Sequence, residues 1–126
     1  KRRIMMGTFV LSTGYYDAYF AKAQKVRRLI QDKTKAIFND YDFLLTPTTP
    51  HAAFKIGHNA DNPVAMYLED IFTVHANLAG NPAISLPLGT NEEGLPFGIQ
   101  LMAPFFGEKE MFGLQEEFLK QWRSGL

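Results

Sequence analysis

Apolar residues recur at helical spacing between residues 16 and 38, and most lysines and arginines of that stretch fall between them. This pattern predicts an amphipathic helix that ends near Asn39 and Asp40. A second apolar stripe predicts a final helix over residues 108–122. Residues 4–14 are apolar and small but show no decisive period, so a short buried helix and a loop both remain open there.

A third helix is predicted over residues 64–79 because Asp61 and Asn62 are possible caps and Pro63 occupies a favoured first-turn position. The Gly80-Asn-Pro sequence closes this helix. Residues 51–62, which are rich in His, Gly, Asn and Asp, predict an irregular surface loop before it.

Short β-type runs alternate with these helices. Residues 41–46 predict a strand that stops at Thr46-Pro-Thr-Thr-Pro, where two prolines remove backbone donors. Residues 83–88 and 97–102 predict a strand and its return, joined by a turn over residues 91–96. The order helix, strand, helix, strand, strand, helix indicates an α/β fold with a sheet covered by helices.

The composition of the 126 residues is close to that of globular proteins, with 46% hydrophobic and 21% charged residues. It fits one domain or a piece of a larger one. The absence of cysteine excludes disulfides, thiol nucleophiles and zinc–thiolate sites. No apolar run is long enough for a membrane span. The chain begins Lys-Arg-Arg-Ile rather than with Met, which reads as the interior of a longer polypeptide.

Charge is distributed unevenly although its formal sum is zero. Residues 1–35 contain nine Lys or Arg and two Asp, a net charge of +7, and the remaining residues carry −7. Two interpretations remain open: a solvated helix face, or a basic surface that meets RNA or an acidic partner.

The residues of a catalytic apparatus are scarce. His51, His58 and His75 lack metal-ligand spacing, and the three serines lie outside the nucleophile motifs Gly-x-Ser-x-Gly and Ser-x-x-Lys. The glycines form neither a phosphate-binding loop nor a dinucleotide fingerprint. We therefore predict no catalytic residue, metal ligand or cofactor-binding residue in this chain.

Two charged residues stand out from apolar surroundings. Asp70 lies in the apolar helical stretch 66–74, and Arg3 borders Ile4-Met-Met. A carboxylate in such a stretch must be paired or reach a cavity, because an unpaired buried charge is very costly. One interpretation is a structural bridge or solvated helix ends. The other is a clamp for an amino acid, in which Arg3 binds a carboxylate bidentately and Asp70 accepts hydrogen bonds from an ammonium.

Several longer motifs resemble the C-terminal third of an amidase-signature enzyme. They are Arg2-Arg-Ile-Met-Met-Gly-Thr-Phe, Gly14-Tyr-Tyr-Asp-Ala-Tyr-Phe, Met66-Tyr-Leu-Glu-Asp-Ile-Phe-Thr-Val, Asn77-Leu-Ala-Gly-Asn-Pro-Ala-Ile-Ser-Leu-Pro and Gly94-Leu-Pro-Phe-Gly-Ile-Gln-Leu. The first two resemble more specifically the branch formed by the A-subunits of the aspartyl/glutamyl-tRNA amidotransferases. The resemblance spans residues 1–122 and implies that residues 1–126 are a C-terminal fragment of a single amidase-signature domain, with a mixed sheet covered by helices.

The resemblance also implies a function. The A-subunit is a glutaminase whose ammonia converts misacylated Glu-tRNA(Gln) or Asp-tRNA(Asn) to Gln-tRNA(Gln) or Asn-tRNA(Asn), a carbon–nitrogen ligase reaction of protein biosynthesis. The family's nucleophilic Ser, cis-Ser and Lys lie upstream, so this fragment alone is expected to be inactive. Arg3 and Asp70 match the family positions that bind the α-carboxylate and α-amino groups of glutamine.

Further expectations follow from the resemblance. The partners would be the B and C subunits of the amidotransferase, with misacylated tRNA reached through the complex and no membrane involved. ATP and Mg would be used by the parent complex and not by this chain. The location would be cytoplasmic, or mitochondrial or plastid in a eukaryote. Two alternatives remain: another amidase-signature amide hydrolase, and an RNA-binding module that uses the basic segment.

Overall fold

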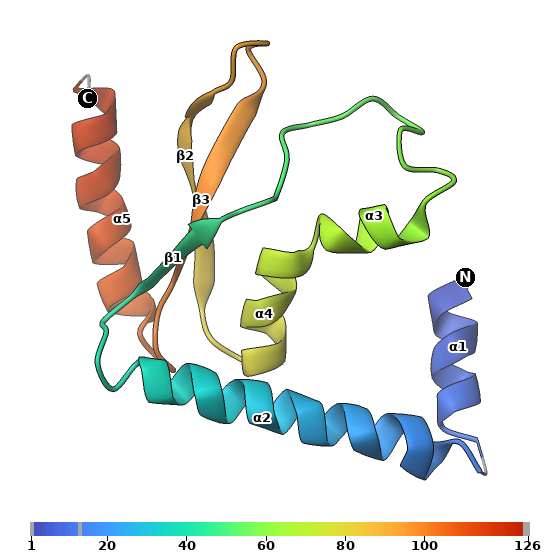
Figure 1. Cartoon of the computed structure of the whole chain (residues 1–126). Helices are drawn as coiled ribbons and strands as arrows, with labels where there is room; N and C mark the ends of the chain where they lie inside the picture. The colour runs from blue at the N-terminus through green and yellow to red at the C-terminus, as the bar shows by residue number, and fades with distance from the viewer. Residues whose placement is uncertain (1, 13, 125–126) are drawn as a thin grey trace.

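The computed structural model describes residues 2–12 and 14–124, and the side chains of Arg2 and Arg3 lie outside this description. Figure 1 shows a small sheet with helices on both faces and a long helix beneath it. The elements follow one another as α1 (Arg2–Val10), η1 (Tyr16–Ala21), α2 (Lys22–Ile37), β1 (Leu44–Pro47), α3 (Pro63–Leu68), α4 (Ile71–Ala79), β2 (Ala83–Thr90), β3 (Pro96–Met102) and α5 (Glu108–Arg123).

The sheet has the order β1-β3-β2, with β3 in the centre. Leu101 of β3 lies opposite Leu45 of β1 and Ile84 of β2, and both pairings are antiparallel. The α/β class is confirmed. The resemblance predicted a mixed sheet, but both strand pairings among the described residues are antiparallel.

Alternating residues of β3 serve opposite faces of the sheet, as the pleat requires. On one face, Leu101 joins Leu86, Ala103 and Met111 of α5 in a buried cluster. On the other, the buried Gln100 side chain donates to the carbonyl oxygen of Phe72 in α4, at 3.2 Å. The sheet is therefore held between α5 and α4, which flank it in Figure 1.

The predicted helix over residues 16–38 is confirmed, but its first six residues form a π-helix before α2 begins. α2 packs against α4 through a hydrogen bond of 2.8 Å between Thr34 Oγ1 and His75 Nε2. The Thr34 hydroxyl donates its one hydrogen to the carbonyl oxygen of Ile30, also at 2.8 Å. Thr34 must therefore accept from His75, which fixes a hydrogen on Nε2 of that imidazole.

The single helix predicted over residues 64–79 is wrong in one respect: it is two helices, α3 and α4, separated by Glu69 and Asp70. Asn62 caps α3 as predicted, accepting from the amide of Ala65 at 3.1 Å. The break arises because the amide of Asp70 bonds to the carbonyl oxygen of Tyr67, three residues back, instead of continuing the α-helical register.

The remaining predicted elements are present with shifts at their ends, and the largest is at β1, which begins at Leu44, three residues later than predicted. Residues 4–14, left open between helix and loop, contain most of α1. Gly80 ends α4 in the left-handed conformation with φ 86°, and Asn91 closes the β2–β3 turn by accepting from the amides of Glu93 and Leu95. In the described ranges, none of the helices has the length and hydropathy that crossing a bilayer demands.

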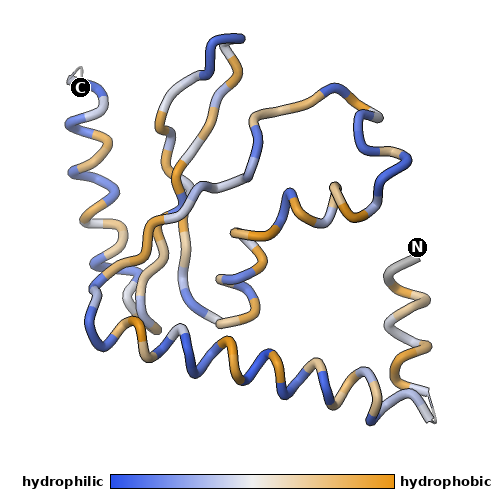
Figure 2. Tube along the Cα trace, in the orientation of Figure 1, coloured by the Kyte–Doolittle hydropathy of each residue, from blue (hydrophilic) through white to orange (hydrophobic). Residues whose placement is uncertain are grey.

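Much of the apolar surface is not covered by this chain. Figure 2 shows hydrophobic positions along α1 and along α2, on segments that stand away from the sheet. Ile4, Met5, Met6 and Phe9 of α1 are all exposed. The fully buried core is small, with Leu101 and Met102 as its largest apolar side chains.

Candidate functional site

The turn between α3 and α4 presents Asp70. Its backbone caps α4, because its carbonyl oxygen accepts from the amide of Val74 at 2.9 Å and from the hydroxyl of Thr73 at 3.2 Å. Its side chain forms no capping hydrogen bond and is exposed. Among the described residues, none hydrogen-bonds to the Asp70 carboxylate or forms an ion pair with it.

This position differs from the expected one. The sequence predicted Asp70 inside an apolar helix, where its charge would need a partner or a cavity. The backbone turn instead brings Asp70 to the surface, and the neighbouring Glu69 is the carboxylate that is enclosed and paired. The assignment of Asp70 as a substrate-binding residue stays a prediction.

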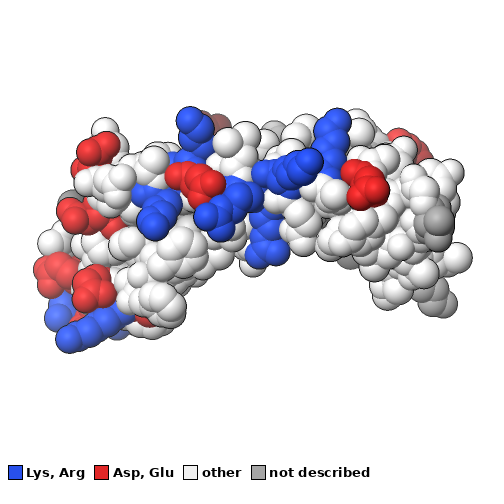
Figure 3. Space-filling view, turned by 90° about the horizontal axis from the view of Figure 1, so that it is seen from below, with Lys and Arg blue, Asp and Glu red and all other residues white. Residues whose placement is uncertain are grey.

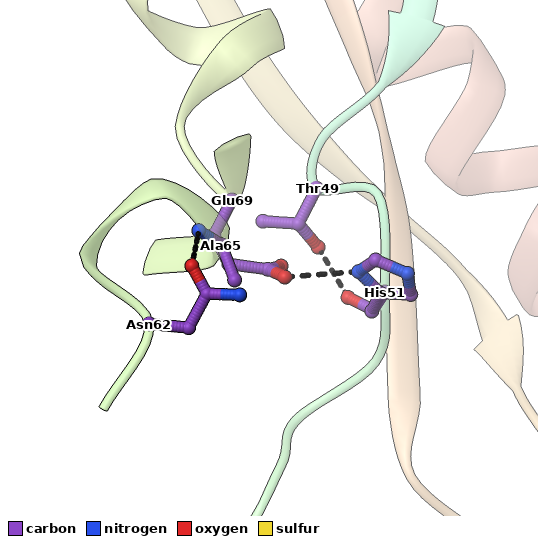
Figure 4. A network of polar contacts seen from close by, with 5 residues as sticks. All are labelled: Thr49, His51, Asn62, Ala65 and Glu69. Atoms are coloured by element: carbon purple, nitrogen blue, oxygen red, sulfur yellow. Dashed lines mark hydrogen bonds and ion pairs between the residues drawn. The ribbon is translucent and has the colours of Figure 1, made fainter. Parts of the chain in front are cut away.

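Glu69 pairs with His51 across the loop that joins β1 to α3, as Figure 4 shows. Nδ1 of His51 lies 2.9 Å from Oε1 of Glu69, and the two side chains are 73% and 14% exposed respectively. An ionised carboxylate only accepts hydrogen bonds, so His51 donates from Nδ1. The Glu69 carboxylate is thus largely shielded from water, and it accepts a hydrogen bond from His51 of the loop.

The start of this loop is fixed to the sheet. The amide of Thr48 donates to the carbonyl oxygen of Gly98 in β3 at 3.1 Å. The Thr48 hydroxyl lies 2.7 Å from the hydroxyl of Ser85 in β2. One residue later, the Thr49 hydroxyl donates to the carbonyl oxygen of His51 at 2.7 Å (Figure 4). The position of His51 therefore depends on the sheet rather than on the loop alone.

A cavity of about 260 Å³ lies between this loop and α3. Its lining combines three apolar residues with two histidines, one asparagine and Glu69: His51, Phe54, His58, Asn59, Ala65, Leu68 and Glu69. Within the described ranges, no group of three His, Asp or Glu side chains could hold a metal ion.

The backbone of Arg3 lies in the first turn of α1. In Figure 1, α1 rises from the end of α2 on the side that also carries α3 and α4. The Arg3 side chain is outside the described part of the chain, so its predicted pairing with Asp70 around one ligand stays a prediction.

The other side chains considered from the sequence have structural contacts. His75 bonds to Thr34, and Ser85 bonds to Thr48. His58 lies against Phe54, with ring centroids 5.9 Å apart. The His51–Glu69 pair was missed because its members lie 18 residues apart and no local spacing relates them.

The exposed Asp70 carboxylate is a candidate acceptor for a cation. A free carboxylate on a fixed backbone turn is a good acceptor for a ligand ammonium, since charge-assisted hydrogen bonds are the stronger ones.

Comparison with known proteins gives this site a family context. A family model described as Amidase matches residues 1–112. A glutamyl-tRNA(Gln) amidotransferase A-subunit from Brevibacillus brevis is 60% identical over 108 residues, which is 86% of this chain and 22% of the relative. The chain thus spans less than a quarter of the length of that relative.

Solved structures agree with this result. A glutamyl-tRNA(Gln) amidotransferase A-subunit from Thermotoga maritima superposes with a TM-score of 0.67 and 55% identity, covering 81% of this chain and 22% of that one. An S177A allophanate hydrolase from Kluyveromyces lactis superposes with a TM-score of 0.62 and 28% identity, covering 80% and 16%. The chain belongs to the amidase family.

Proposed function

We propose that this chain is the C-terminal part of a single amidase-signature domain, in the glutamine-hydrolysing A-subunit of a tRNA-dependent amidotransferase. The observation that carries the proposal is the high identity to such proteins: 60% to the Brevibacillus brevis protein and 55% to the Thermotoga maritima structure. Allophanate hydrolase, which shares the fold, is 28% identical. This difference favours the tRNA-dependent branch over another amide hydrolase.

In the proposed function, this segment provides one wall of the glutamine site. The exposed Asp70 carboxylate would accept hydrogen bonds from the α-ammonium of glutamine. Arg3 would bind the α-carboxylate through its guanidinium. Bond cleavage would depend on the Ser, cis-Ser and Lys that the family carries upstream, so the segment alone would release no ammonia.

The parent complex would contain the B and C subunits and would act on misacylated tRNA in the cytoplasm, or in a mitochondrion or plastid of a eukaryote. The ammonia released from glutamine would amidate the glutamyl or aspartyl group on that tRNA. ATP and Mg²⁺ would be used by the parent complex, and the described residues of this chain form no metal-binding group.

A substrate panel on the full-length subunit tests the proposal. Glutamine should be hydrolysed, and amides that lack the α-ammonium or the α-carboxylate should be poor substrates, because each leaves one member of the clamp without its partner. The control is the same panel on a variant that lacks the upstream nucleophile. Equal rates for simple aliphatic amides and for glutamine would favour a general amide hydrolase instead.

A further inference from the structure

Two adjacent carboxylates at the α3–α4 turn have opposite environments. Glu69 is mostly enclosed and bonded to His51, whereas the Asp70 side chain is exposed and has no described partner. We propose that His51 and Glu69 are positioning residues, which hold this turn so that Asp70 faces the α-ammonium of glutamine. This inference rests on the proposed function and adds to it two residues that do not touch the substrate.

The loop side of the pair is anchored to the sheet. Thr48 bonds to Gly98 of β3 through its amide, at 3.1 Å, and to Ser85 of β2 through its hydroxyl, at 2.7 Å. Thr49 then holds the carbonyl oxygen of His51. These bonds connect the backbone at His51 to two strands, so the imidazole extends from an anchored backbone to Glu69, and the pair relates the α3–α4 turn to the sheet.

The backbone of the α3–α4 turn links the position of Glu69 to that of Asp70. The amide of Glu69 bonds to Ala65 in α3, and the carbonyl oxygen of Asp70 bonds to Val74 in α4. Glu69 and Asp70 share a peptide unit, which is planar and stiff. A displacement of the Glu69 backbone therefore moves the Asp70 carboxylate, and charge-assisted recognition is sensitive to such shifts.

Burial explains why the pair holds the turn. The Glu69 side chain is 14% exposed, and an ionised carboxylate in that position is costly when its partner is removed. Without His51, Glu69 would turn toward water and distort the turn. Glu69 would then be a second free carboxylate, one residue from Asp70. It would compete with Asp70 for the same ammonium and hold glutamine in a different position.

The test uses the full-length subunit in its complex and separates KM from kcat. In His51→Ala we expect KM for glutamine to rise about fivefold, in line with roughly 1 kcal/mol for a partly exposed pair, while kcat stays near wild type. Ammonia-dependent product formation should be unchanged. His51→Gln, whose amide still donates to Glu69, should recover most of the wild-type KM.

Coupling and a matched control sharpen the test. In a Glu69→Ala background, adding His51→Ala should change KM no further, because His51 then has no partner. The control is His58→Ala, which removes a histidine of the same loop and cavity that contacts Phe54 rather than a carboxylate. It should keep the wild-type KM.

Two results would overturn the inference. A wild-type KM in His51→Ala would show that the pair does not position the site. An equal fall of glutamine-dependent and ammonia-dependent activity in that variant would show a purely structural role. A different result would overturn the proposed function itself: a wild-type complex that shows no glutamine-dependent activity. The positioning role of His51 and Glu69 would then fail with it.

Discussion

Glycine at position 98 allows an unusually close approach inside the sheet. A Cβ atom there would lie 2.8 Å from the carbonyl oxygen of Leu86 and 2.9 Å from the hydroxyl oxygen of Ser85. It would also lie 3.1 Å from the hydroxyl oxygen of Thr48. The same residue accepts the Thr48 amide bond that fixes the loop of the candidate site.

We therefore expect Gly98→Ala to lower the free energy of unfolding of the full-length subunit by about 1–3 kcal/mol, as overpacking does. Gly113→Ala is a matched control, because a Cβ atom at that position in α5 meets no other atom of this chain within 4 Å, its own helix aside. Alanine should stabilise that helix by up to about 1 kcal/mol. Thermal unfolding of both variants measures the difference, and equal midpoints would contradict the close approach at Gly98.

At the candidate site, the sequence identified Asp70 as a candidate residue, but it did not predict that Asp70 lies exposed on a turn beside the His51–Glu69 pair. A charge in an apolar stretch is a visible signal, and a helical period continues through residues 64–79. The amide of Asp70 bonds to the carbonyl oxygen of Tyr67, which breaks the helix. The apolar residues on either side keep their helical spacing in the sequence, so the pattern does not show the break. The partner of Glu69 comes from a distant loop, so only the folded chain reveals it.

Between elements, two polar contacts connect α2 to α4: Arg27 donates to the carbonyl oxygen of Leu78, and Thr34 bonds to His75. Thr34 is 2% exposed, and its hydroxyl accepts from His75 while donating to Ile30. A groove lined by apolar residues of both helices surrounds this contact, with Leu29, Ile30, Ile71 and Val74 among them. The Thr34–His75 bond thus joins the two helices within an apolar contact, in addition to the Arg27–Leu78 bond.

Thr34→Val should destabilise the full-length subunit by about 1–3 kcal/mol, because it leaves the His75 donor without a partner in a partly buried position. In a double-mutant cycle with His75→Phe, we expect a coupling of about 1 kcal/mol from denaturant unfolding. Thr8→Val is the matched control, since the Thr8 hydroxyl bonds to the carbonyl oxygen of Ile4 within its own helix and joins no two elements. A cycle without coupling would show that the contact contributes nothing to stability.

The helices and strands themselves were largely predictable. Periodicity located α2 and α5, and local chemistry located the start of α3 at Asn62 and Pro63 and the end of α4 at Gly80. The π-helical start before α2 was not predictable, because its wider turn leaves the apolar residues on nearly the same face. Strand pairing depends on contacts distant in sequence, which the pattern of one chain does not specify.

The basic residues of α2 lie on its outer surface. Figure 3 shows Lys and Arg gathered in a band on the side of the molecule that α2 occupies. Part of this charge has local roles: Arg27 donates to the carbonyl oxygen of Leu78, and Arg28 pairs with Asp32 at 3.1 Å. These contacts account for two of the six basic side chains of α2, and we expect the band to be a solvated helix face rather than a nucleic-acid surface.

Replacing Lys22, Lys25, Lys33 and Lys35 by Ala should therefore change the affinity of the full-length subunit for tRNA by less than about twofold. An RNA-binding surface would lose affinity and also show a shallower dependence on salt, because each phosphate contact releases counterions. Gel shifts at several salt concentrations distinguish the two. A marked loss with a reduced salt slope would favour the RNA-binding alternative.

At the scale of the whole molecule, apolar surface exceeds what this chain covers. Ile4 is 76% exposed, Ile56 106% and Phe106 92%, and the buried core consists of a few residues around β3. The two amidotransferase relatives are more than four times as long as the matched segment. The exposed faces are consistent with a segment whose remaining contacts come from the rest of such a domain.

The 126 residues alone should consequently self-associate, because exposed apolar faces and open strand edges both promote association. Light scattering over a concentration series measures this directly. Mild denaturant provides the control, since it should reduce the apparent mass as apolar contacts weaken. A monodisperse monomer that unfolds cooperatively at a high midpoint would contradict the expectation.

In the proposed function, Arg3 and Asp70 bind the amino-acid end of glutamine. Truncating one partner of a charge pair enclosed with its ligand costs roughly 2–5 kcal/mol, and about 1.4 kcal/mol corresponds to tenfold. Arg3→Ala and Asp70→Ala should each lower kcat/KM for glutamine by about 30-fold or more. Free ammonia bypasses the glutamine site, so ammonia-dependent product formation should survive.

The most direct measurement is the ratio of glutamine-dependent to ammonia-dependent product formation in Asp70→Asn of the full-length complex. Asparagine keeps the size and shape of the side chain but removes the charge that an ammonium requires. If Asp70 binds the ammonium, this ratio should fall by at least about tenfold while ammonia-dependent activity stays near wild type. A ratio at the wild-type value would contradict it, and Asp70 would then only cap α4.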